Sequence, residues 1–167
     1  NLYNIFVSRN GSNVDTGLDT MTGGRIKRIQ KYIGDESFCL TYGDGVCDVD
    51  IAALVEFHKS QGRIATLTGV QPEGRFGIMD IAGIQIQSFR EKDKEDTGWI
   101  NGGYMVLEPA IFDYIPADTY YGMDKLIKDL MAKNIPVIKY EMDEYWLDIG
   151  RVKDYERAQA DYDEKFK

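Results

Sequence analysis

Short apolar runs alternate with amphipathic stretches through the first part of the chain, as in proteins that alternate strands and helices. The amphipathic stretches repeat apolar residues every three or four positions, and each is followed by a glycine that commonly ends a helix, Gly34 or Gly62. Thr22 and Asp50 precede them as candidate N-caps. The predicted elements are a helix over 23–33, a strand over 37–42, a helix over 51–61 and a strand over 64–70. This β–α–β order predicts parallel strands joined by crossover helices.

The pattern changes in the second part of the chain. Two alternating segments separated by an Ala-Gly pair predict a β-hairpin, and a strand interrupted by a double glycine follows. The last segment, 151–167, is a charged helix with Tyr155, Ala158 and Tyr162 spaced to face inward. The remaining predicted elements are a short strand over 4–8, a turn over 9–13, hairpin strands over 76–81 and 84–89, strands over 99–107, 137–140 and 145–147, and helices over 108–114 and 123–133.

Composition indicates one globular domain over residues 1–167. Hydrophobic residues make up 43% of the chain and aromatic residues 12%, which is enough for a packed core. The formal net charge of -8 repels nucleic acids and anionic membranes, so we expect neither as a partner. It also repels phosphorylated substrates, which would need local Lys, Arg or a metal ion to offset the charge. Self-association of the chain as a homo-oligomer is left open.

The cysteines and the histidine do not indicate a further metal or catalytic site, and no targeting signal is found. Cys39 and Cys47 form no Cys-x-x-Cys pair, so we expect buried free thiols rather than a zinc or redox site. His58 lies in a predicted helix beside Lys59, and we expect it to be solvated or half-buried. The chain shows no signal peptide and no apolar run of 18 residues, which favours the cytoplasm.

Two aspartates that follow apolar runs are the strongest candidates for chemistry. Asp44 lies in the sequence YGDG (42–45), and Asp148 lies in YWLDIG (145–150). If both runs are strands of one sheet, their ends can converge at its carboxyl edge, with the carboxylates about 6 Å apart or less. Such a pair could bind Mg²⁺, which would offset the charge on a phosphate. The alternative is that each aspartate caps a turn.

Two further segments carry groups suited to a sugar phosphate. Glu91 and Lys92 end the predicted hairpin; a glutamate can accept hydrogen bonds from sugar hydroxyls, and a lysine can bind phosphate. A solvated loop is the alternative for this pair. Asn101 and Gly102 interrupt an apolar strand, which marks either the close approach of a ligand or a simple bulge.

The segment TGGR (22–25) begins a predicted helix, and N–H groups at a helix start can bind a phosphate or the edge of a base. The segment lacks the spacing and the ending of a Walker phosphate-binding loop. The basic residues nearby are interpreted as the solvated face of the helix. They are Arg25, Lys27, Arg28 and Lys31.

Two weaker candidates complete the set. Arg75 lies in GRFG (74–77), which is either a turn or a loop that presents the arginine to an anion. Asp48 and Asp50 match the Asp-x-Asp pattern of metal-dependent glycosyltransferases, although Asp50 already has a role as a helix cap.

Six short motifs stand in a fixed order along the chain. They are DTG (15–17), MTGGR (21–25), YGDGV (42–46), GRFG (74–77), SFREK (88–92) and INGG (100–103). In this order and spacing they resemble the glucose-1-phosphate cytidylyltransferase branch of the sugar-phosphate nucleotidyltransferases. The resemblance covers about residues 13–110, whereas residues 144–159 are more similar to the wider family.

The resemblance implies a Rossmann-like, GT-A-like α/β fold with a mixed, mostly parallel sheet and helices on both faces. It implies transfer of a nucleotidyl group from CTP to glucose 1-phosphate, with release of pyrophosphate and with Mg²⁺ as cofactor. Asp44, Asp148 and Lys92 would be catalytic, and the two aspartates would bind the metal. The implied substrate-binding residues are Thr22, Gly23, Gly24, Arg25, Gly43, Arg75, Gly77, Glu91, Lys92, Asn101 and Gly102.

The resemblance also predicts that the chain is a fragment. The family begins with a strand and a glycine-rich loop that binds triphosphate, and no segment here matches them. We therefore expect the C-terminal two-thirds of a catalytic domain, which alone makes no CDP-glucose. The alternatives are a non-catalytic sugar-phosphate-binding or assembly module, a nucleotidyltransferase of other base specificity (GTP, UTP or dTTP), and a glycosyltransferase that uses Asp48 and Asp50.

Overall fold

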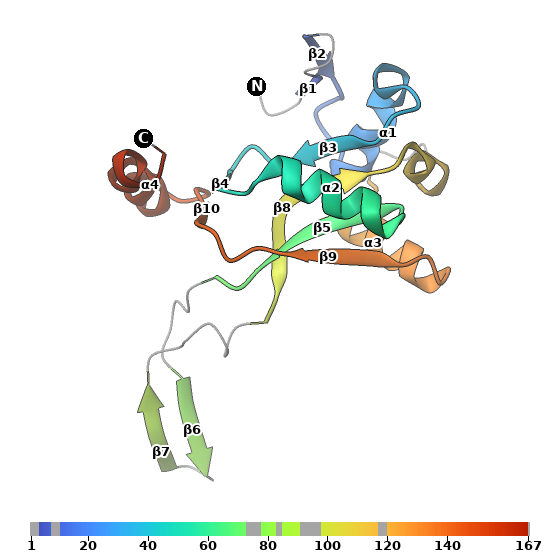
Figure 1. The fold of residues 1–167 in the computed structure, drawn as a ribbon. Helices are drawn as coiled ribbons and strands as arrows, with labels where there is room; N and C mark the ends of the chain where they lie inside the picture. Colours follow the sequence, from blue (N-terminus) through green and yellow to red (C-terminus); the bar gives the residue numbers. More distant parts are fainter. Residues whose placement is uncertain are drawn as a thin grey trace. The chain divides into compact units, whose positions relative to one another are not determined.

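The structure is a computed structural model that describes residues 4–7, 11–72, 78–82, 85–90, 98–116 and 120–166. Its helices are α1 (Thr22–Ile33), α2 (Ile51–Gln61), the 3-10 helix η1 (Pro109–Tyr114), α3 (Met123–Ala132) and α4 (Val152–Lys165). Its strands are β1 (Asn4–Val7), β2 (Ser12–Asp15), β3 (Phe38–Thr41), β4 (Gly45–Cys47), β5 (Ala65–Val70), β6 (Ile78–Ala82), β7 (Gln85–Arg90), β8 (Ile100–Leu107), β9 (Val137–Glu141) and β10 (Trp146–Asp148) (Figure 1). No helix within these ranges is long and apolar enough to cross a membrane.

The largest sheet has four strands in the order β3-β8-β5-β9. Strand β8 runs antiparallel to β5, because Glu108 hydrogen-bonds to Ile64 at one end and Tyr104 hydrogen-bonds to Thr68 towards the other. The hydrogen bonds between β8 and the β3 segment run in the same antiparallel sense. The sheet is therefore mixed, and the predicted α/β fold class is confirmed. The insertion of β8 between β3 and β5 was not predicted.

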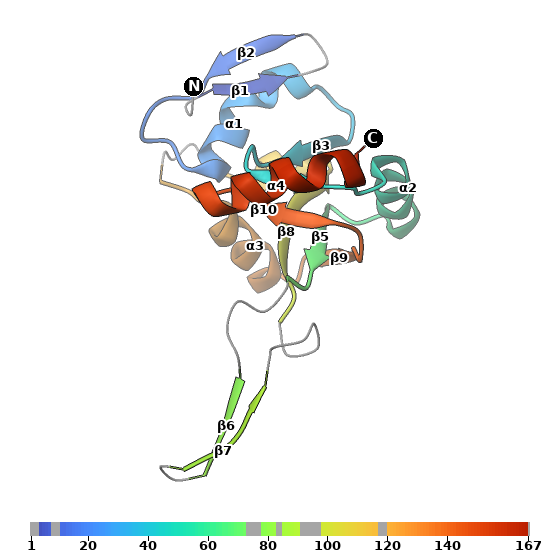
Figure 2. The ribbon, with the colours of Figure 1, turned by 90° about the vertical axis from the view of Figure 1, so that its left-hand side faces the viewer.

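Three further strand pairs are antiparallel. Strands β1 and β2 pair beside α1 (Figure 2), where only β1 was predicted. Strands β6 and β7 form the predicted hairpin, with a bulge between Asp80 and Ile81. Strands β4 and β10 form a separate two-stranded ribbon.

The chain divides into two compact units, each made of three separate segments. Unit 1 comprises Asn1–Leu40, Ala52–Leu67 and Met105–Ile138, and unit 2 comprises Thr41–Ile51, Thr68–Tyr104 and Lys139–Lys167. The division cuts each of the four strands of the largest sheet. Both units are therefore assembled from segments that are far apart in the sequence.

The apolar core of unit 1 lies where α1, α3 and η1 pack together. Helix α1 buries Ile26 and Ile29, and α3 buries Leu126 and Leu130, as their apolar spacing predicts, whereas Met131 of α3 is 63% exposed. Phe112 of η1 is also buried, and its ring stacks on the ring of Phe38 at a centroid distance of 5.5 Å. Burial of such side chains contributes about 1.5–3 kcal/mol each.

Helix α4, in unit 2, lies along β10 (Figure 2). Tyr155 and Tyr162 are 52% and 53% exposed, so the prediction that they face inward is wrong. Asp154 is the buried position of this helix, and it accepts two hydrogen bonds from Arg151, at 2.6 and 2.8 Å. The Tyr145 hydroxyl, directly before β10, also donates to Asp161 of α4 at 3.0 Å, a polar contact that apolar periodicity does not report.

Both cysteines are free, but the prediction of buried thiols is wrong for Cys39, which is exposed on β3. Residues of β3 alternate between half-buried and exposed, and Cys39 falls on the exposed side. Cys47 is half-buried on β4, and burial raises the pKa of its thiol.

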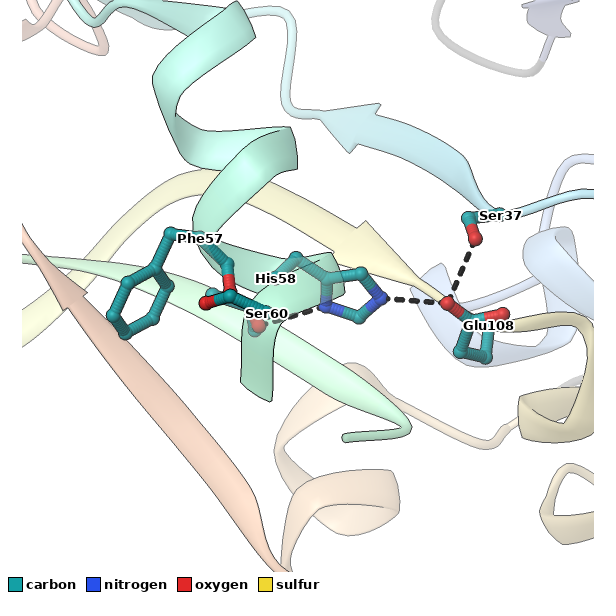
Figure 3. A network of polar contacts seen from close by, with 6 residues as sticks. Ser37, Phe57, His58, Ser60 and Glu108 are labelled. Atoms are coloured by element: carbon teal, nitrogen blue, oxygen red, sulfur yellow. Dashed lines mark hydrogen bonds and ion pairs between the residues drawn. The ribbon is translucent and has the colours of Figure 1, made fainter. Parts of the chain in front are cut away.

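His58 is 1% exposed, so the prediction of a solvated or half-buried side chain is wrong. Its Nε2 lies 2.8 Å from Oε1 of Glu108 (Figure 3), and its Nδ1 lies 2.8 Å from the hydroxyl of Thr66. The hydroxyl of Ser37 donates to the same oxygen of Glu108, at 2.7 Å. With Glu108 ionised, Nε2 donates to the carboxylate, and Nδ1 shares a hydrogen bond with the Thr66 hydroxyl. Both ring nitrogens are therefore satisfied inside unit 1.

The same contacts shift the titration of Glu108. Burial alone would raise the pKa of this carboxyl, but hydrogen bonds from Ser37 and His58 outweigh burial and hold its pKa below the usual range. A carboxyl whose pKa falls on folding stabilises the protein above its unfolded-state pKa, about 4.3. That stabilisation is lost as the pH falls through the folded-state pKa.

The Glu108→Gln variant is expected to lower the free energy of unfolding at pH 7 by about 1 kcal/mol. The value lies below the range for charged hydrogen bonds because the Glu108 side chain is 37% exposed. The difference from wild type should shrink as the pH falls below about 4.3. Urea unfolding across this range measures it, with Glu56→Gln on the exposed side of α2 as the control. A loss of free energy of unfolding that is the same at every pH would contradict the lowered pKa assigned to Glu108.

Candidate substrate and metal site

The β4–β10 ribbon of unit 2 brings the two predicted aspartates together. Asp148 is the last residue of β10 and stands opposite Gly45 of β4. One residue further on, the Ile149 N–H donates to the Asp44 carbonyl at 2.9 Å. Asp148, at the end of β10, therefore lies beside Asp44, which directly precedes β4, although the two residues are 104 positions apart in the sequence (148 minus 44). The carboxylate distance of about 6 Å stays a prediction.

The two carboxylates have different surroundings. Asp148 is half-buried, and its Oδ1 accepts a hydrogen bond from the Gly150 N–H at 2.7 Å, which fixes the side chain in a turn. Asp44 is exposed, and its carboxylate makes no hydrogen bond or ion pair with the part of the chain that the structure describes. The hydrogen bond with Asp154 raises the pKa of Arg151, and the nearby charge of Asp148 raises it further. Asp148 thus lies in the field of a permanent cation.

The donor set fits Mg²⁺. This ion commonly binds one or two carboxylates together with water and substrate phosphates, rather than a cage of protein ligands. Among the described residues, no group of three or more His, Cys, Asp or Glu side chains is arranged to hold a metal. Two carboxylates at neighbouring backbone positions therefore suit an ion shared with a phosphate, and they do not suit a closed structural zinc site.

The Asn101 turn, residues 101–103, interrupts β8 in the same unit. Asn101 is exposed, and its Oδ1 accepts a hydrogen bond from the Gly103 N–H at 2.9 Å. Gly103 has a φ of +85°, which favours glycine. A Cβ on Gly102 would lie 2.7 Å from the Thr68 hydroxyl, so this position has no room for a side chain. The amide nitrogen of Asn101 has no acceptor among the described residues.

Two aromatic side chains that the sequence did not identify connect these segments. The indole N–H of Trp146 donates to the Gly102 carbonyl at 2.8 Å. The hydroxyl of Tyr104 donates to the Gly45 carbonyl at 2.9 Å. Trp146 lies in the same motif as Asp148, and Tyr104 directly follows the double glycine, so their positions next to candidate residues are the only sequence signal for them.

The predicted substrate-binding segment 22–25 lies in unit 1 and has packing roles there. Helix α1 begins at Thr22 with Met21 as its N-cap, so the prediction of Thr22 as N-cap is wrong by one residue. The hydroxyl of Thr22 accepts a hydrogen bond from the first N–H of α3 at 2.8 Å. Gly24 donates its N–H to the Tyr121 carbonyl at 3.0 Å, and a Cβ on Gly23 would lie 2.7 Å from that carbonyl oxygen. This packing accounts for the small residues without a ligand.

The basic residues of α1 are mostly engaged rather than solvated, which corrects that interpretation. Arg25 donates to the Thr16 hydroxyl at 2.6 Å, and Arg28 donates to the Thr16 carbonyl at 2.6 Å. Lys27 donates to the carbonyl of Phe112 at 2.6 Å. These bonds hold the DTG segment and η1 against α1.

Four predicted site residues lie outside the described residues: Arg75, Gly77, Glu91 and Lys92. Gly43 is exposed, directly before Asp44. Asp48 and Asp50 lie between β4 and α2, where the Asp48 N–H donates to the Tyr145 carbonyl at 3.1 Å. Asp48 is therefore fixed to the ribbon through its backbone.

A family model described as nucleotidyl transferase matches residues 16–165, and the chain belongs to this family. The sequence is 44% identical to glucose-1-phosphate cytidylyltransferase of Salmonella typhimurium over 143 residues, which is 84% of this chain and 55% of the relative. It is 32% identical to UTP–glucose-1-phosphate uridylyltransferase of Synechocystis, over 82% of this chain and 38% of the relative.

The fold is also similar to a solved structure of UDP-glucose pyrophosphorylase in complex with UDP-glucose. The TM-score is 0.66 and the sequence identity 17%, over 92% of this chain and 66% of that one. The predicted resemblance to sugar-phosphate nucleotidyltransferases and the Rossmann-like fold are thus confirmed. The chain spans about half the length, or less, of the two curated relatives named here.

Proposed function

We propose that the protein acts in the transfer of a nucleotidyl group from CTP to glucose 1-phosphate, which forms a nucleotide sugar and pyrophosphate. The observation that carries the proposal is the position of Asp148 at the end of β10, beside Asp44 directly before β4. The choice of cytidine and glucose is supported by the 44% identity to a glucose-1-phosphate cytidylyltransferase. We assign the activity to the cytoplasm.

Asp44 and Asp148 would hold Mg²⁺, which when bound would offset negative charge on the reacting phosphates. Because the chain carries a formal net charge of -8, an anionic substrate needs such local compensation. The amide of Asn101 would hydrogen-bond sugar hydroxyls, and this role is supported by its exposed position with an unused donor. Binding of both substrates would place the sugar phosphate oxygen for attack on the α-phosphorus.

The remaining roles follow from the motifs alone and are part of the proposal. Glu91 would accept hydrogen bonds from the sugar, and Lys92 would bind its phosphate and take part in catalysis. Arg75 and Gly77 would contact substrate, as would Gly43, Gly102 and the segment 22–25 near the base. The nucleoside triphosphate and the sugar 1-phosphate are the proposed partners.

Titration calorimetry with glucose 1-phosphate and pyrophosphate release from CTP test the proposed function. With Mg²⁺ present, the protein should bind glucose 1-phosphate more tightly than glucose 6-phosphate, and CTP should be preferred to UTP. Absence of glucose 1-phosphate binding would refute the proposal. Binding without pyrophosphate release is the result expected of an incomplete catalytic domain, and it would also fit a non-catalytic sugar-phosphate-binding module. Release with another nucleoside triphosphate would correct the base.

The Lys92→Ala variant is expected to weaken glucose 1-phosphate binding by about 1.5–3 kcal/mol, the range for a hydrogen bond to a charged group. This corresponds to roughly 10- to 150-fold in Kd. Calorimetry against the wild-type protein measures the change. Lys94→Ala removes the same charge two residues further on and serves as the matched control. Equal losses in the two variants would reduce the role of Lys92 to general electrostatic attraction.

A further inference from the structure

The candidate metal-binding and sugar-binding residues of unit 2 lie on two separate sets of paired strands. Asp44 and Asp148 lie on the β4–β10 ribbon, whereas Asn101 lies on β8 of the four-stranded sheet. Among the described strands, no ladder of paired strands joins the ribbon to β8. Two residues before Asp44, the Tyr42 N–H donates to the Gly103 carbonyl of β8 at 3.2 Å. The spacing between the metal-binding and sugar-binding groups beyond this point depends on contacts of side chains.

Those contacts include two reciprocal hydrogen bonds from aromatic side chains. Trp146 of the ribbon donates to the carbonyl of Gly102 on β8, at 2.8 Å. Tyr104 of β8 donates to the carbonyl of Gly45 on the ribbon, at 2.9 Å. Each acceptor directly follows a candidate ligand in the sequence, since Gly102 follows Asn101 and Gly45 follows Asp44.

The donors are themselves held firmly. The Thr68 hydroxyl, which is fully buried, donates to the Tyr104 carbonyl at 2.9 Å and accepts from the Tyr104 N–H at 3.3 Å. Tyrosine and tryptophan have few rotatable bonds, so they fix a geometry at a low entropy cost. Burial raises the pKa of Tyr104, so its hydroxyl stays protonated and can donate at neutral pH.

We propose that Trp146 and Tyr104 form an aromatic clamp of positioning residues that sets the spacing between the Asp44–Asp148 pair and the Asn101 turn. The inference rests on the proposed function. A fixed spacing lets one bound metal ion and one bound sugar phosphate reinforce each other, so the affinity for each rises when the other is bound. Loosening the clamp lowers this coupling without removing any group that touches a ligand.

The test uses three single variants of the 167-residue chain. Tyr104→Phe and Trp146→Phe each remove one clamp donor. Tyr145→Phe is the matched control, because it removes a tyrosine hydroxyl of the same unit that donates to Asp161 of α4 at 3.0 Å and not to β8. Calorimetry measures glucose 1-phosphate binding with and without Mn²⁺, below the Tm of every variant. Hydrogen exchange measures the amides of β4 and of residues 101–104 in the ligand-free proteins.

Each clamp variant is expected to reduce the Mn²⁺-dependent gain in glucose 1-phosphate affinity roughly fivefold, the equivalent of one neutral hydrogen bond. Each should also speed hydrogen exchange on both connected strands, whereas the control should change neither quantity. Unchanged coupling and exchange would overturn the clamp while leaving the proposed function intact. If the wild-type chain binds no glucose 1-phosphate, the proposed function fails, and the exchange comparison alone decides whether the two aromatic residues position the strands.

Discussion

In a form of the protein that catalyses nucleotidyl transfer, asparagine in place of Asp148 is expected to reduce the rate roughly 100-fold or more, the cost of removing one preorganised electrostatic contact. Mn²⁺ affinity should fall roughly tenfold or more in the same variant. The cause is the loss of one of only two carboxylates proposed to hold the metal. Asparagine keeps the size of the side chain and can still accept the Gly150 N–H, so the turn should survive. Mn²⁺ titration and pyrophosphate release measure the two effects.

The Asp44→Asn variant should behave in the same way, because the proposed ion needs both carboxylates. Asp124→Asn is the matched control: this aspartate is exposed on α3 in unit 1, where it pairs only weakly with Lys128 at 3.6 Å. Metal affinity that is lost equally in all three variants would indicate a general effect of charge. Affinity that is retained in both site variants would exclude the proposed metal site.

The Gly102→Ala variant is expected to destabilise the protein by about 1–3 kcal/mol, the usual cost of overpacking a filled position. The added Cβ would lie 2.7 Å from the Thr68 hydroxyl and 3.0 Å from Cγ1 of Val70. Neither neighbour can move freely, because Thr68 is fully buried and bonded to Tyr104. The Tm should fall by roughly 2–10 °C, and glucose 1-phosphate affinity should fall because the Asn101 turn is displaced.

Gly45→Ala is the control for this effect. Its Cβ would lie 3.7 Å from the Gly102 carbonyl oxygen and 3.8 Å from the ring of Tyr104, which are ordinary contacts. We expect a stability change within about 0.5 kcal/mol. The double variant Gly102→Ala with Thr68→Ala should be less destabilised than the sum of the single changes, because the closest clash is removed. Simple additivity would mean that Thr68 is not the obstacle.

Local signals predicted the regular elements well. Apolar residues spaced by three or four positions identified α1 and α3, and both predicted helix stops, Gly34 and Gly62, have positive φ values of 75° and 56°. The alternating segments around an Ala-Gly pair identified the β6–β7 hairpin. These features depend on residues that are close together in the sequence, so a single sequence contains the information.

Features that depend on distant partners were missed. His58 is buried because Glu108, 50 residues away, accepts its N–H. The exposed tyrosines of α4 have the spacing of a buried face, but α4 meets the segment before β10 through a polar bond, from the Tyr145 hydroxyl to Asp161. Periodicity does not report polar contacts of this kind, since a satisfied buried polar group and an exposed one have the same sequence pattern.

In the candidate site, too, features that depend on local sequence were predicted and contacts between distant residues were missed. The interpretation of Asp44 and Asp148 as strand-end residues led to the prediction that they lie close together, and the ribbon places their backbones side by side. The bonds of Trp146 and Tyr104 span 44 and 59 residues, so no local pattern indicated them. Glu91 and Lys92 stay predictions, since they lie outside the described residues.

The division into units has a consequence for synthesis on the ribosome. Unit 1 takes its last segment from residues 105–138, and unit 2 takes its last segment from residues 139–167. Unit 1 is incomplete until residues 105–138 have left the exit tunnel, and unit 2 until residues 139–167 have done so, so neither unit can fold from its first segment alone. Partners that are far apart in the sequence also raise the contact order, which slows folding. The growing chain must keep its unpaired strands from aggregating until the final segments arrive.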